Sequence, residues 1–228
     1  HPKTSQPAIG DFVNKFKYLS SQYESVISIH IPERLSGTMQ SCKNAINKID
    51  NFKITAIDSL SASVGLGLIV KSAGELAENH TNHDILIDKI NKLIASTKIF
   101  LAIRDLNYAI KGGRVSKYKG AFAKFFNIRP ILTTDSEGKL KIASAFFGEK
   151  NLHKKMGDFI IRNINNQKHY KFSIAHSNAE DEGSELLDYI QDNFKNIISI
   201  DLVDMGSALG VHAGPGAFGV GYQEVCNE

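Results

Sequence analysis

The chain has 228 residues, which is long enough for one large domain or two modest ones. Hydrophobic residues make up 42% and charged residues 22%, values that are typical of a globular protein and exclude a disordered or fibrous chain. The net charge of +3 arises from 27 basic and 24 acidic residues without any run of five like charges, which argues against a nucleic-acid-binding protein.

Neither membrane spans nor disulfides are expected. The longest apolar stretch, residues 54–70, is interrupted by Asp58, serines and two glycines, and no segment reaches the ~18–20 apolar residues that cross a bilayer. We therefore expect at most transient membrane contact. The 2 cysteines are far apart and form no CxxC pair, which predicts a reduced, cytoplasmic protein. The chain opens HPKTSQP, with neither an initiating Met nor an apolar leader, so we expect it to be trimmed or to begin within a larger protein.

The first half alternates helices with short strands. Apolar spacing and β-branched runs predict a helix at 11–20, a strand at 25–31, a helix at 39–49, a strand at 54–57, and helices at 64–78 and 86–94. This alternation predicts parallel strands joined by crossover helices.

The second half has a different pattern. The predicted elements are a strand at 98–103, a short helix ending at 112–113, a hairpin of 128–134 and 139–146 around the turn DSEG, a helix at 152–160, a strand at 172–176, a helix at 186–194 and a strand at 197–203. A glycine-rich segment at 206–221 follows, with no element assigned. We therefore place a domain boundary near Thr97, between an α/β domain of residues 1–97 with a parallel sheet and an α+β domain of residues 98–228 with a mixed sheet.

The common catalytic motifs are missing. The sequence contains no GxxxxGK[ST] phosphate loop, no GxSxG nucleophile motif and no HExxH zinc motif. The run Gly65-Leu66-Gly67 lacks a third glycine in register, so it is more typical of close strand–helix packing than of a nucleotide site. We expect no catalytic residue, no metal site and no cofactor.

Two polar turns precede helices. TSQP at 4–7 comes before the first helix, and SGT at 36–38 lies between a strand and a helix. Both are open to a plain interpretation as helix caps, because Ser and Thr side chains satisfy free backbone amides there. The functional alternative is an anion site, since a glycine lets the backbone approach a ligand and a helix N-terminus favours negative charge.

Two glycine-rich turns are further candidates. His212 leads the sequence HAGPG at 212–216, which can simply join two strands or can place an imidazole donor against an anion. The run GGR at 112–114 is typical of a helix C-cap with a cation near the negative end of the helix.

In their order along the chain these motifs resemble those of DegV family proteins, and in particular the fatty-acid-binding subunits of bacterial fatty acid kinase. The resemblance is carried by TSQP at 4–7, SGT at 36–38, DS at 58–59, GGR at 112–114, RPI at 129–131 and HxGPG at 212–216. It spans the whole chain, and it implies an N-terminal α/β domain, a C-terminal α+β domain and a long-chain fatty acid between them.

The resemblance also implies roles for individual residues. Thr4, Ser36 and His212 would contact the carboxylate of the fatty acid, and Arg114 would lie near the surface that meets an ATP-dependent kinase subunit. The supporting loops would contain Ser5, Gly37, Thr38, Asp58, Ser59, Gly214 and Gly216. The chain would then be a non-catalytic subunit that presents the carboxylate for acyl-phosphate formation, in the service of phospholipid synthesis.

The chain departs from the family pattern in two places. Family members begin with about one more strand–helix pair before TSQP, so the first domain is expected to lack a strand. The family often carries an arginine after the hairpin that helps partner docking, and this chain has the sequence ASAFF at 143–147 instead.

Two other functions are compatible with the same residues. One is a stand-alone lipid transport or regulatory protein that has no kinase partner. The other is an esterase or acyltransferase using Ser36 and His212, which would need an acidic group to orient the histidine. Asp58 is the one attractive candidate for that group.

Overall fold

The first part of the chain contains a small parallel sheet. The computed structural model describes residues 2–79, 82–115, 128–148 and 150–225. Its first elements are α1 (Ile9–Ser20), β1 (Ser25–His30), α2 (Thr38–Ile46), β2 (Lys53–Asp58), α3 (Ser63–Asn79) and α4 (His83–Ser96). β1 and β2 pair in parallel, from Ser25 opposite Lys53 to His30 opposite Asp58. The predicted parallel strands of this part are therefore confirmed.

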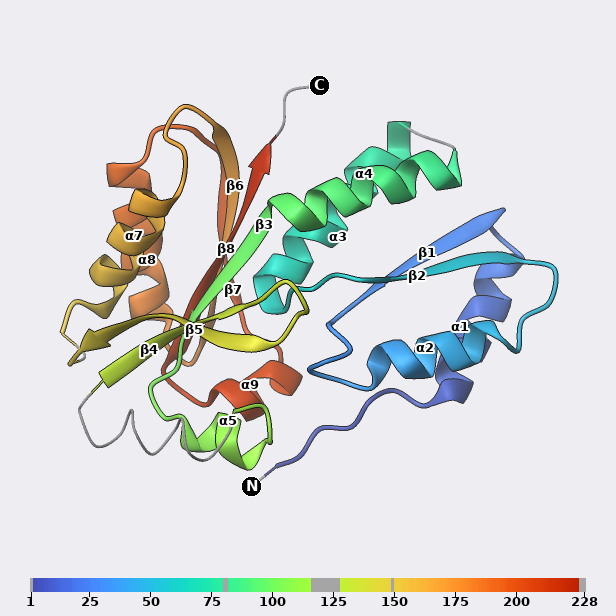
Figure 1. Cartoon of the computed structure of the whole chain (residues 1–228), viewed down its shortest axis with the longest axis horizontal. Coiled ribbons are helices and arrows are strands. Elements are labelled where there is room, and N and C mark those ends of the chain that lie inside the picture. The colour runs from blue at the N-terminus through green and yellow to red at the C-terminus, as the bar shows by residue number, and fades with distance from the viewer. Residues whose placement is uncertain (1, 80–81, 116–127, 149, 226–228) are drawn as a thin grey trace.

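Helices cover both faces of this two-stranded sheet (Figure 1). Because side chains alternate along a strand, neighbouring residues of β1 enter different cores. Val26 packs with Phe16 of α1 and Cys42 of α2, whereas Ile27 packs with Ile69 of α3. The two faces of the small sheet therefore pack against different helices, α1 and α2 on one side and α3 on the other.

The second part contains a larger mixed sheet. Its elements are β3 (Thr97–Ala102), α5 (Asn107–Lys111), β4 (Ile128–Thr134), β5 (Leu140–Phe147), α7 (Leu152–Asn163), β6 (His169–Ser177), α8 (Glu180–Asn193), β7 (Ile197–Asp204), α9 (Ser207–Ala213) and β8 (Ala217–Val225). The strands lie in the order β5-β4-β3-β8-β6-β7. β6 and β7 are parallel to each other, and the other neighbours are antiparallel. The predicted α+β architecture with a mixed sheet is confirmed.

Different helices cover the two faces of this larger sheet (Figure 1). On one face α7 and α8 pack into the main core, where Met156 and Leu186 meet Phe172 of the sheet, and all three are fully buried. On the other face lies α3, whose buried Ser72 hydroxyl donates a 2.6 Å hydrogen bond to Gln223 of β8. Since α3 also covers the small sheet, this helix joins the two parts of the molecule. The boundary near Thr97 stays a prediction.

α9 and most of β8 lie in the glycine-rich segment for which no helix or strand was predicted. β8 is a central strand between β3 and β6, but glycines interrupt its apolar pattern. A Cβ on Gly219 would lie 2.8 Å from the Phe100 carbonyl oxygen, and one on Gly221 would lie 3.0 Å from the amide nitrogen of Gly65. These glycines therefore allow β8 to pack closely against β3 and α3. In the sequence alone, a strand with several glycines has the composition of a loop.

The β4–β5 hairpin reaches across to the first part of the chain. The Asp135 carboxylate accepts hydrogen bonds from the amides of Glu137 and Lys139, both at 2.9 Å, and this fixes the predicted turn. A Cβ on Gly138 would lie 2.5 Å from Cβ of Pro32, in the loop after β1. The hairpin tip thus contacts the loop that carries Ser36.

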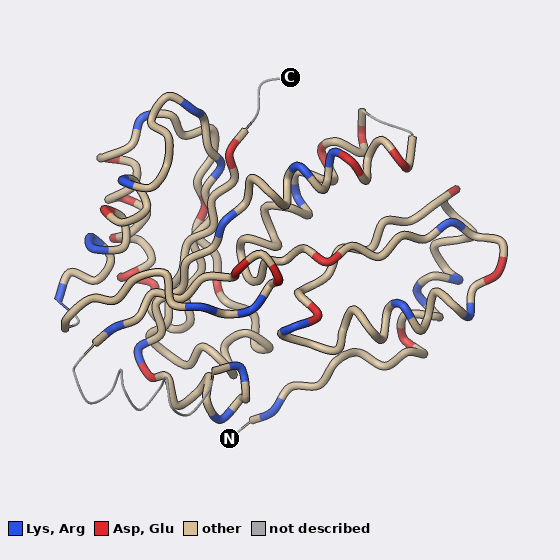
Figure 2. Tube along the Cα trace, in the orientation of Figure 1, with Lys and Arg blue, Asp and Glu red and all other residues tan. Residues whose placement is uncertain are grey.

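Figure 2 shows basic and acidic residues interspersed over both parts of the chain. Within the described residues, no helix is long and apolar enough to cross a membrane.

Candidate functional site

A cavity of about 450 Å³ lies between the two parts of the molecule. From the first part it is lined by Thr4, Ser5, Pro7, Ile31, Leu35, Ser36, Thr38, Ala62, Ser63 and Leu66. From the second part it is lined by Ile99, Leu101, Ile103, Ala109, Arg114, Leu132, Thr133, Thr134, Leu140, Met205, Ala208, Leu209, His212 and Ala213. The polar side chains include Thr4, Ser36 and His212, and most of the remaining wall is aliphatic. Such a cavity suits a ligand with a long apolar body and one polar end.

Thr4 and His212 are joined directly. Oγ1 of Thr4 lies 2.8 Å from Nε2 of His212, in the last turn of α9. The TSQP segment is not a helix cap, because the N-cap of α1 is Ala8, which makes no side-chain capping bond. The segment instead runs beside α5 and α9 (Figure 1). Its residues Thr4, Ser5 and Pro7 line the cavity.

Gln6 ties the same segment to α2. Its amide nitrogen donates to the Ser41 hydroxyl at 3.0 Å. A Cβ on Gly37 would lie 1.8 Å from Oε1 of Gln6, so a glycine at position 37 makes room for this side chain. The capping interpretation of SGT puts a Ser or Thr side chain at the cap, but the N-cap residue of α2 is Gly37, which makes no side-chain capping bond. Its absent side chain instead serves the contact with Gln6.

Ser36 and Thr38 form a hydroxyl pair at the start of α2. Their oxygens are 2.8 Å apart, and the Thr38 amide donates to Ser36 Oγ at 3.3 Å. Ser36 Oγ therefore uses its acceptor capacity on the backbone of α2. Both hydroxyls line the cavity and can rotate their hydrogens toward an anion.

His212 is held in its neutral form. Burial, and secondarily the positive charge of Arg114, lowers the pKa of His212 below its ordinary value of 6.5. Its Nδ1 atom is buried and has no hydrogen-bond partner within the described part of the chain. Because an unpaired buried N–H is rarer than an unpaired acceptor, we assign the proton to Nε2. Nε2 then donates to Thr4, which leaves the Thr4 hydroxyl hydrogen free for a ligand.

Gly112 makes room for this imidazole. A Cβ at position 112 would lie 2.1 Å from Nδ1 of His212. Gly112 is also the C-cap residue of α5, and its amide donates to the Tyr108 carbonyl, as the capping interpretation of GGR predicts. Gly112 thus ends α5 and also leaves the space that the imidazole of His212 occupies.

Arg114 lines the cavity. Its Nε donates to the Leu35 carbonyl at 3.3 Å, and Nη1 donates to the Gly112 carbonyl. The side chain is half-buried and connects the turn after α5 to the loop that precedes Ser36. Its expected place near a partner surface stays a prediction.

Of the other loop residues named from sequence, Ser5 and Thr38 line the cavity, whereas Gly37, Asp58, Ser59, Gly214 and Gly216 are not among its lining residues. The Asp58 carboxylate accepts from the amides of Glu33 and Leu60, at 3.0 and 2.8 Å, and so joins the loops after β1 and β2. The Ser59 hydroxyl donates to the Ser61 carbonyl at 2.8 Å, which stabilises the turn that contains both residues.

The glycines of HAGPG shape the link from α9 to β8. Gly214 and Gly216 have φ values of 75° and 80°, in the region that favours glycine. A Cβ on Gly214 would lie 2.5 Å from the Tyr108 ring, and one on Gly216 would lie 2.6 Å from Cδ of Arg104. This turn therefore connects a helix to a strand, rather than two strands.

The apolar wall was missed by sequence reasoning. Leu101 and Leu132 read as ordinary strand core, because a core position and a ligand-contacting position have the same periodicity. Leu209 lies in the glycine-rich segment to which no element was assigned. The sequence feature that could have identified Leu209 as a cavity residue is the short apolar run at 208–211, next to His212.

Known proteins are similar to this chain in both sequence and fold. The family described as "Uncharacterised protein, DegV family" matches residues 1–225. A DegV domain-containing protein of Clostridium acetobutylicum is 32% identical over 220 residues, which are 96% of this chain and 78% of the relative. One from Staphylococcus aureus is 32% identical over 229 residues, with 96% of this chain and 77% of the relative covered.

Solved structures agree with the sequence match. A fatty acid binding DegV family protein from Streptococcus agalactiae has a TM-score of 0.87 at 26% identity, covering 99% of this chain and 79% of that one. A Thermotoga maritima protein described as having fatty acid binding function has a TM-score of 0.85 at 25% identity, covering 98% and 78%. A Thermus thermophilus DegV family protein has a TM-score of 0.90 at 24% identity over 98% and 79%. With the fold and a match over nearly its whole length, this chain belongs to the DegV family.

Proposed function

We propose that this chain binds a long-chain fatty acid in the cavity between its two parts and presents the carboxylate to an ATP-dependent kinase subunit. The observation that carries the proposal is that Thr4, Ser36 and His212, from three distant segments, line one largely aliphatic cavity. Solved relatives at 25% and 26% identity are described as binding fatty acids, which supports the same ligand here.

The aliphatic wall supplies the affinity for the tail. Each buried methylene contributes about 0.8 kcal/mol, so a tail of about sixteen carbons contributes on the order of 10 kcal/mol before the costs of ordering it. The head group needs hydrogen bonds instead, because an unpaired buried carboxylate is very costly. In the proposal, the hydroxyls of Thr4 and Ser36 donate these bonds, and Nε2 of His212 orients the Thr4 hydroxyl by donating to its oxygen.

The polar end is suited to a carboxylate that must still react. Hydroxyl donors, one of them oriented by a neutral imidazole, hold an anion by directional hydrogen bonds, without a bidentate ion pair that would oppose attack by its oxygen. Arg114 also lines the cavity, but its guanidinium already donates to the carbonyls of Leu35 and Gly112. The kinase would supply ATP and metal, and this chain would shelter the acyl phosphate from water.

The esterase alternative lacks its third group. In such a site an acid orients the histidine through the ring nitrogen opposite the nucleophile. Nδ1 of His212 has no partner among the described residues, and the Asp58 carboxylate accepts from two backbone amides. This arrangement favours a binding role over a hydrolytic one.

Ser36→Ala tests the proposal in two assays. Its fatty acid affinity should stay within about threefold of wild type, because the tail dominates binding, whereas acyl-phosphate formation in a reconstituted kinase assay should fall by about tenfold or more. The matched control is Ser20→Ala, in an exposed position at the end of α1. Full acyl-phosphate formation by Ser36→Ala would refute the role of Ser36.

A stand-alone lipid carrier would use the same cavity. Organic extracts of the purified protein, analysed by mass spectrometry, test ligand binding itself, and an extract without fatty acid contradicts both functions. Co-purification with an ATP-binding partner separates the two, because a carrier has no need of that partner.

A further inference from the structure

A row of side chains on β3 runs along the cavity. Ile99 and Leu101 of β3, and Ile103 directly after this strand, all line the cavity. Because they are spaced two residues apart, they point to the same face of the sheet, and at ~3.3 Å per residue the row spans about 13 Å. The row therefore gives the cavity a direction, with Ile103 at one end and Ile99 at the other.

Ile103 marks the end that holds the head group. It packs with Ala109 of α5 in a buried cluster. Gly112, at the C-terminus of α5, abuts His212, since a Cβ at position 112 would lie 2.1 Å from Nδ1 of the imidazole. Thr4 is hydrogen-bonded to the same imidazole. The polar groups that are proposed to bind the carboxylate thus lie near Ile103.

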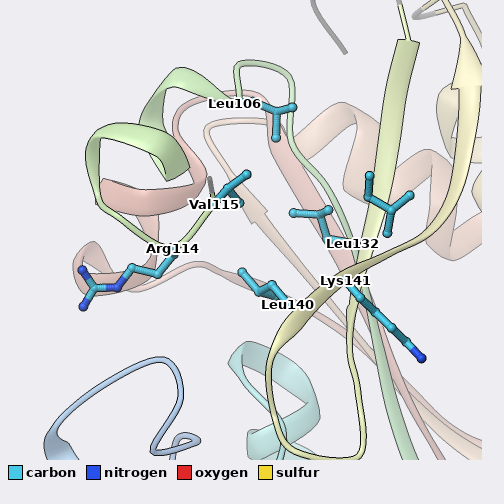
Figure 3. A pocket seen from close by; sticks show the side chains of 7 residues that line it. Leu106, Arg114, Val115, Leu132, Leu140 and Lys141 are labelled. Carbon is cyan, nitrogen blue, oxygen red and sulfur yellow. The ribbon is translucent and has the colours of Figure 1, made fainter. Parts of the chain in front are cut away.

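A small recess adjoins the cavity at this same end. It has a volume of about 180 Å³ and shares Arg114, Leu132 and Leu140 with the cavity wall. Leu132 packs with Ile103, and Arg114 donates to the Gly112 carbonyl. Figure 3 shows the charged end of Arg114 extending away from Leu132 and Leu140. The recess therefore lies beside the head group, and the far end of an acyl chain must be sought in the other direction.

Ile99 marks that opposite end. It packs with Val64 of α3, and Met205 lies against the same cluster. A Cβ on Gly65 would lie 3.2 Å from Cβ of Ile99, and one on Gly221 would lie 3.0 Å from the amide nitrogen of Gly65. The first turn of α3 therefore packs directly on β3 and β8, and this contact bounds the cavity at Ile99.

Apolar side chains from separate elements line this bounded end. Leu66 follows Gly65 on α3, Ile99 belongs to β3, and Met205 lies in the turn between β7 and α9. Among the described residues that line the cavity, Arg114 alone is charged, and it lies at the other end. The thioether of Met205 is flexible and adapts to the shape of what packs against it. This end is therefore suited to a hydrocarbon terminus.

We propose that the methyl end of the acyl chain lies against Leu66, Ile99 and Met205, and that these three side chains set the upper limit of chain length. The inference rests on the proposed fatty acid function. When the carboxylate is held beside His212, a longer chain extends further along the row from Ile103 toward Ile99. The side chains at Ile99 then decide which chains still fit.

Two variants change this end in opposite directions. Leu66→Phe adds volume to the wall, and Met205→Ala removes volume at a half-buried position. Each protein is incubated with an equimolar mixture of saturated fatty acids of increasing length, and the bound acids are quantified by native mass spectrometry. We expect Leu66→Phe to lose about fourfold in affinity for each methylene that it excludes, with shorter chains unaffected. Met205→Ala should shift the preference toward longer chains.

Two further variants serve as controls. Val70→Phe adds an aromatic ring to the same helix at a position that is 47% exposed and outside the cavity wall, so it should keep the wild-type length profile. Ile103→Ala removes volume at the head-group end of the row. Because every chain passes Ile103, this variant should weaken the binding of all lengths by a similar factor.

The outcomes separate this inference from the function on which it rests. If the wild type binds fatty acids but the folded Leu66 and Met205 variants keep its length profile, or weaken all lengths equally, the inference is wrong and the proposed function stands. A length shift in Ile103→Ala instead would also overturn the inference, because it would reverse the direction of the chain. A wild type that binds no fatty acid of any length would overturn both. If Leu66→Phe fails to fold, the shift expected of Met205→Ala decides alone.

Discussion

The Thr4 hydroxyl lies 2.8 Å from Nε2 of His212, although 208 residues separate them along the chain. The bond connects the segment before α1 to the last turn of α9, and it forms at the polar end of the cavity. One hydrogen bond therefore both joins distant parts of the chain and orients the imidazole.

Thr4→Val removes the hydroxyl and keeps the shape of the side chain. We expect the free energy of unfolding to fall by about 1 kcal/mol, because Nε2 of His212 loses its partner in a half-buried site. Affinity for a fatty acid should fall more than in Ser36→Ala, by about tenfold, because the carboxylate loses a donor and the imidazole beside it also loses the partner that orients it. Chemical denaturation and ligand titration measure the two effects. The control is Thr134→Val, in the wall of the same cavity, and equal losses in both variants would contradict a specific role for Thr4.

The polar residues of the site could be found from sequence, but not their meeting place. Thr4, Ser36 and His212 each lie close to a proline or glycine that marks a turn in the sequence, and this makes them visible without a structure. Their convergence depends on α9, which contains His212, and on β8, the strand of the larger sheet that follows α9. Those elements were hidden because Gly219 and Gly221 interrupt the apolar pattern of β8.

The parallel strands of the first part, the helices other than α9 and the hairpin could be predicted because they depend on local patterns. Gly37 and Gly112 show the limit of such patterns. Both read as helix-terminal residues, and the structure has both at helix termini. Their second role is to leave room for Gln6 and His212, and this depends on partners brought close only by the tertiary fold.

Gly112→Ala tests this second role. The new methyl group would lie 2.1 Å from Nδ1 of His212, so the imidazole or the end of α5 must move. We expect the free energy of unfolding to fall by about 1–3 kcal/mol, which is typical of overpacking, and ligand affinity to fall with it. In a His212→Ala background the same substitution should cost little, giving a coupling of about 1 kcal/mol or more.

A glycine without such a neighbour provides the control. A Cβ on Gly74 of α3 would meet nothing within 4 Å, so Gly74→Ala should leave stability unchanged or raise it by up to about 1 kcal/mol. If Gly112→Ala costs as much with His212 present as without it, the contact between these residues is not the cause.

Arg114→Met tests the electrostatics of the site. The guanidinium is the second cause, after burial, of the low pKa of His212. Its removal should therefore raise the pKa of His212 toward the ordinary value of 6.5, which an NMR titration of the imidazole can follow. Arg34→Met is the matched control, because Arg34 is exposed and pairs with Glu137 at the hairpin tip. An unchanged pKa in Arg114→Met would show that burial alone holds His212 neutral.

The lowered pKa of His83 leads to a prediction of how the free energy of unfolding depends on pH. His83 is the first residue of α4 and is buried against β1 and β2, with Nδ1 2.8 Å from Ser25 Oγ and Nε2 2.9 Å from Thr55 Oγ1. Burial, and then the charge of Lys53, lowers its pKa below the ordinary value of 6.5. Between that lowered pKa and 6.5 the unfolded chain binds more protons than the folded chain. The free energy of unfolding should therefore fall as the pH drops below 6.5.

His83→Gln should lose this contribution to the pH dependence. At neutral pH the variant should also be less stable than wild type by about 1–3 kcal/mol, because at least one buried hydroxyl loses its partner. His169→Gln, at an exposed position on β6, is the control and should keep the wild-type slope. Urea denaturation across this pH range measures all three proteins. A slope in His83→Gln as steep as in wild type would assign the acid sensitivity to His30 and His212, whose pKa values burial also lowers.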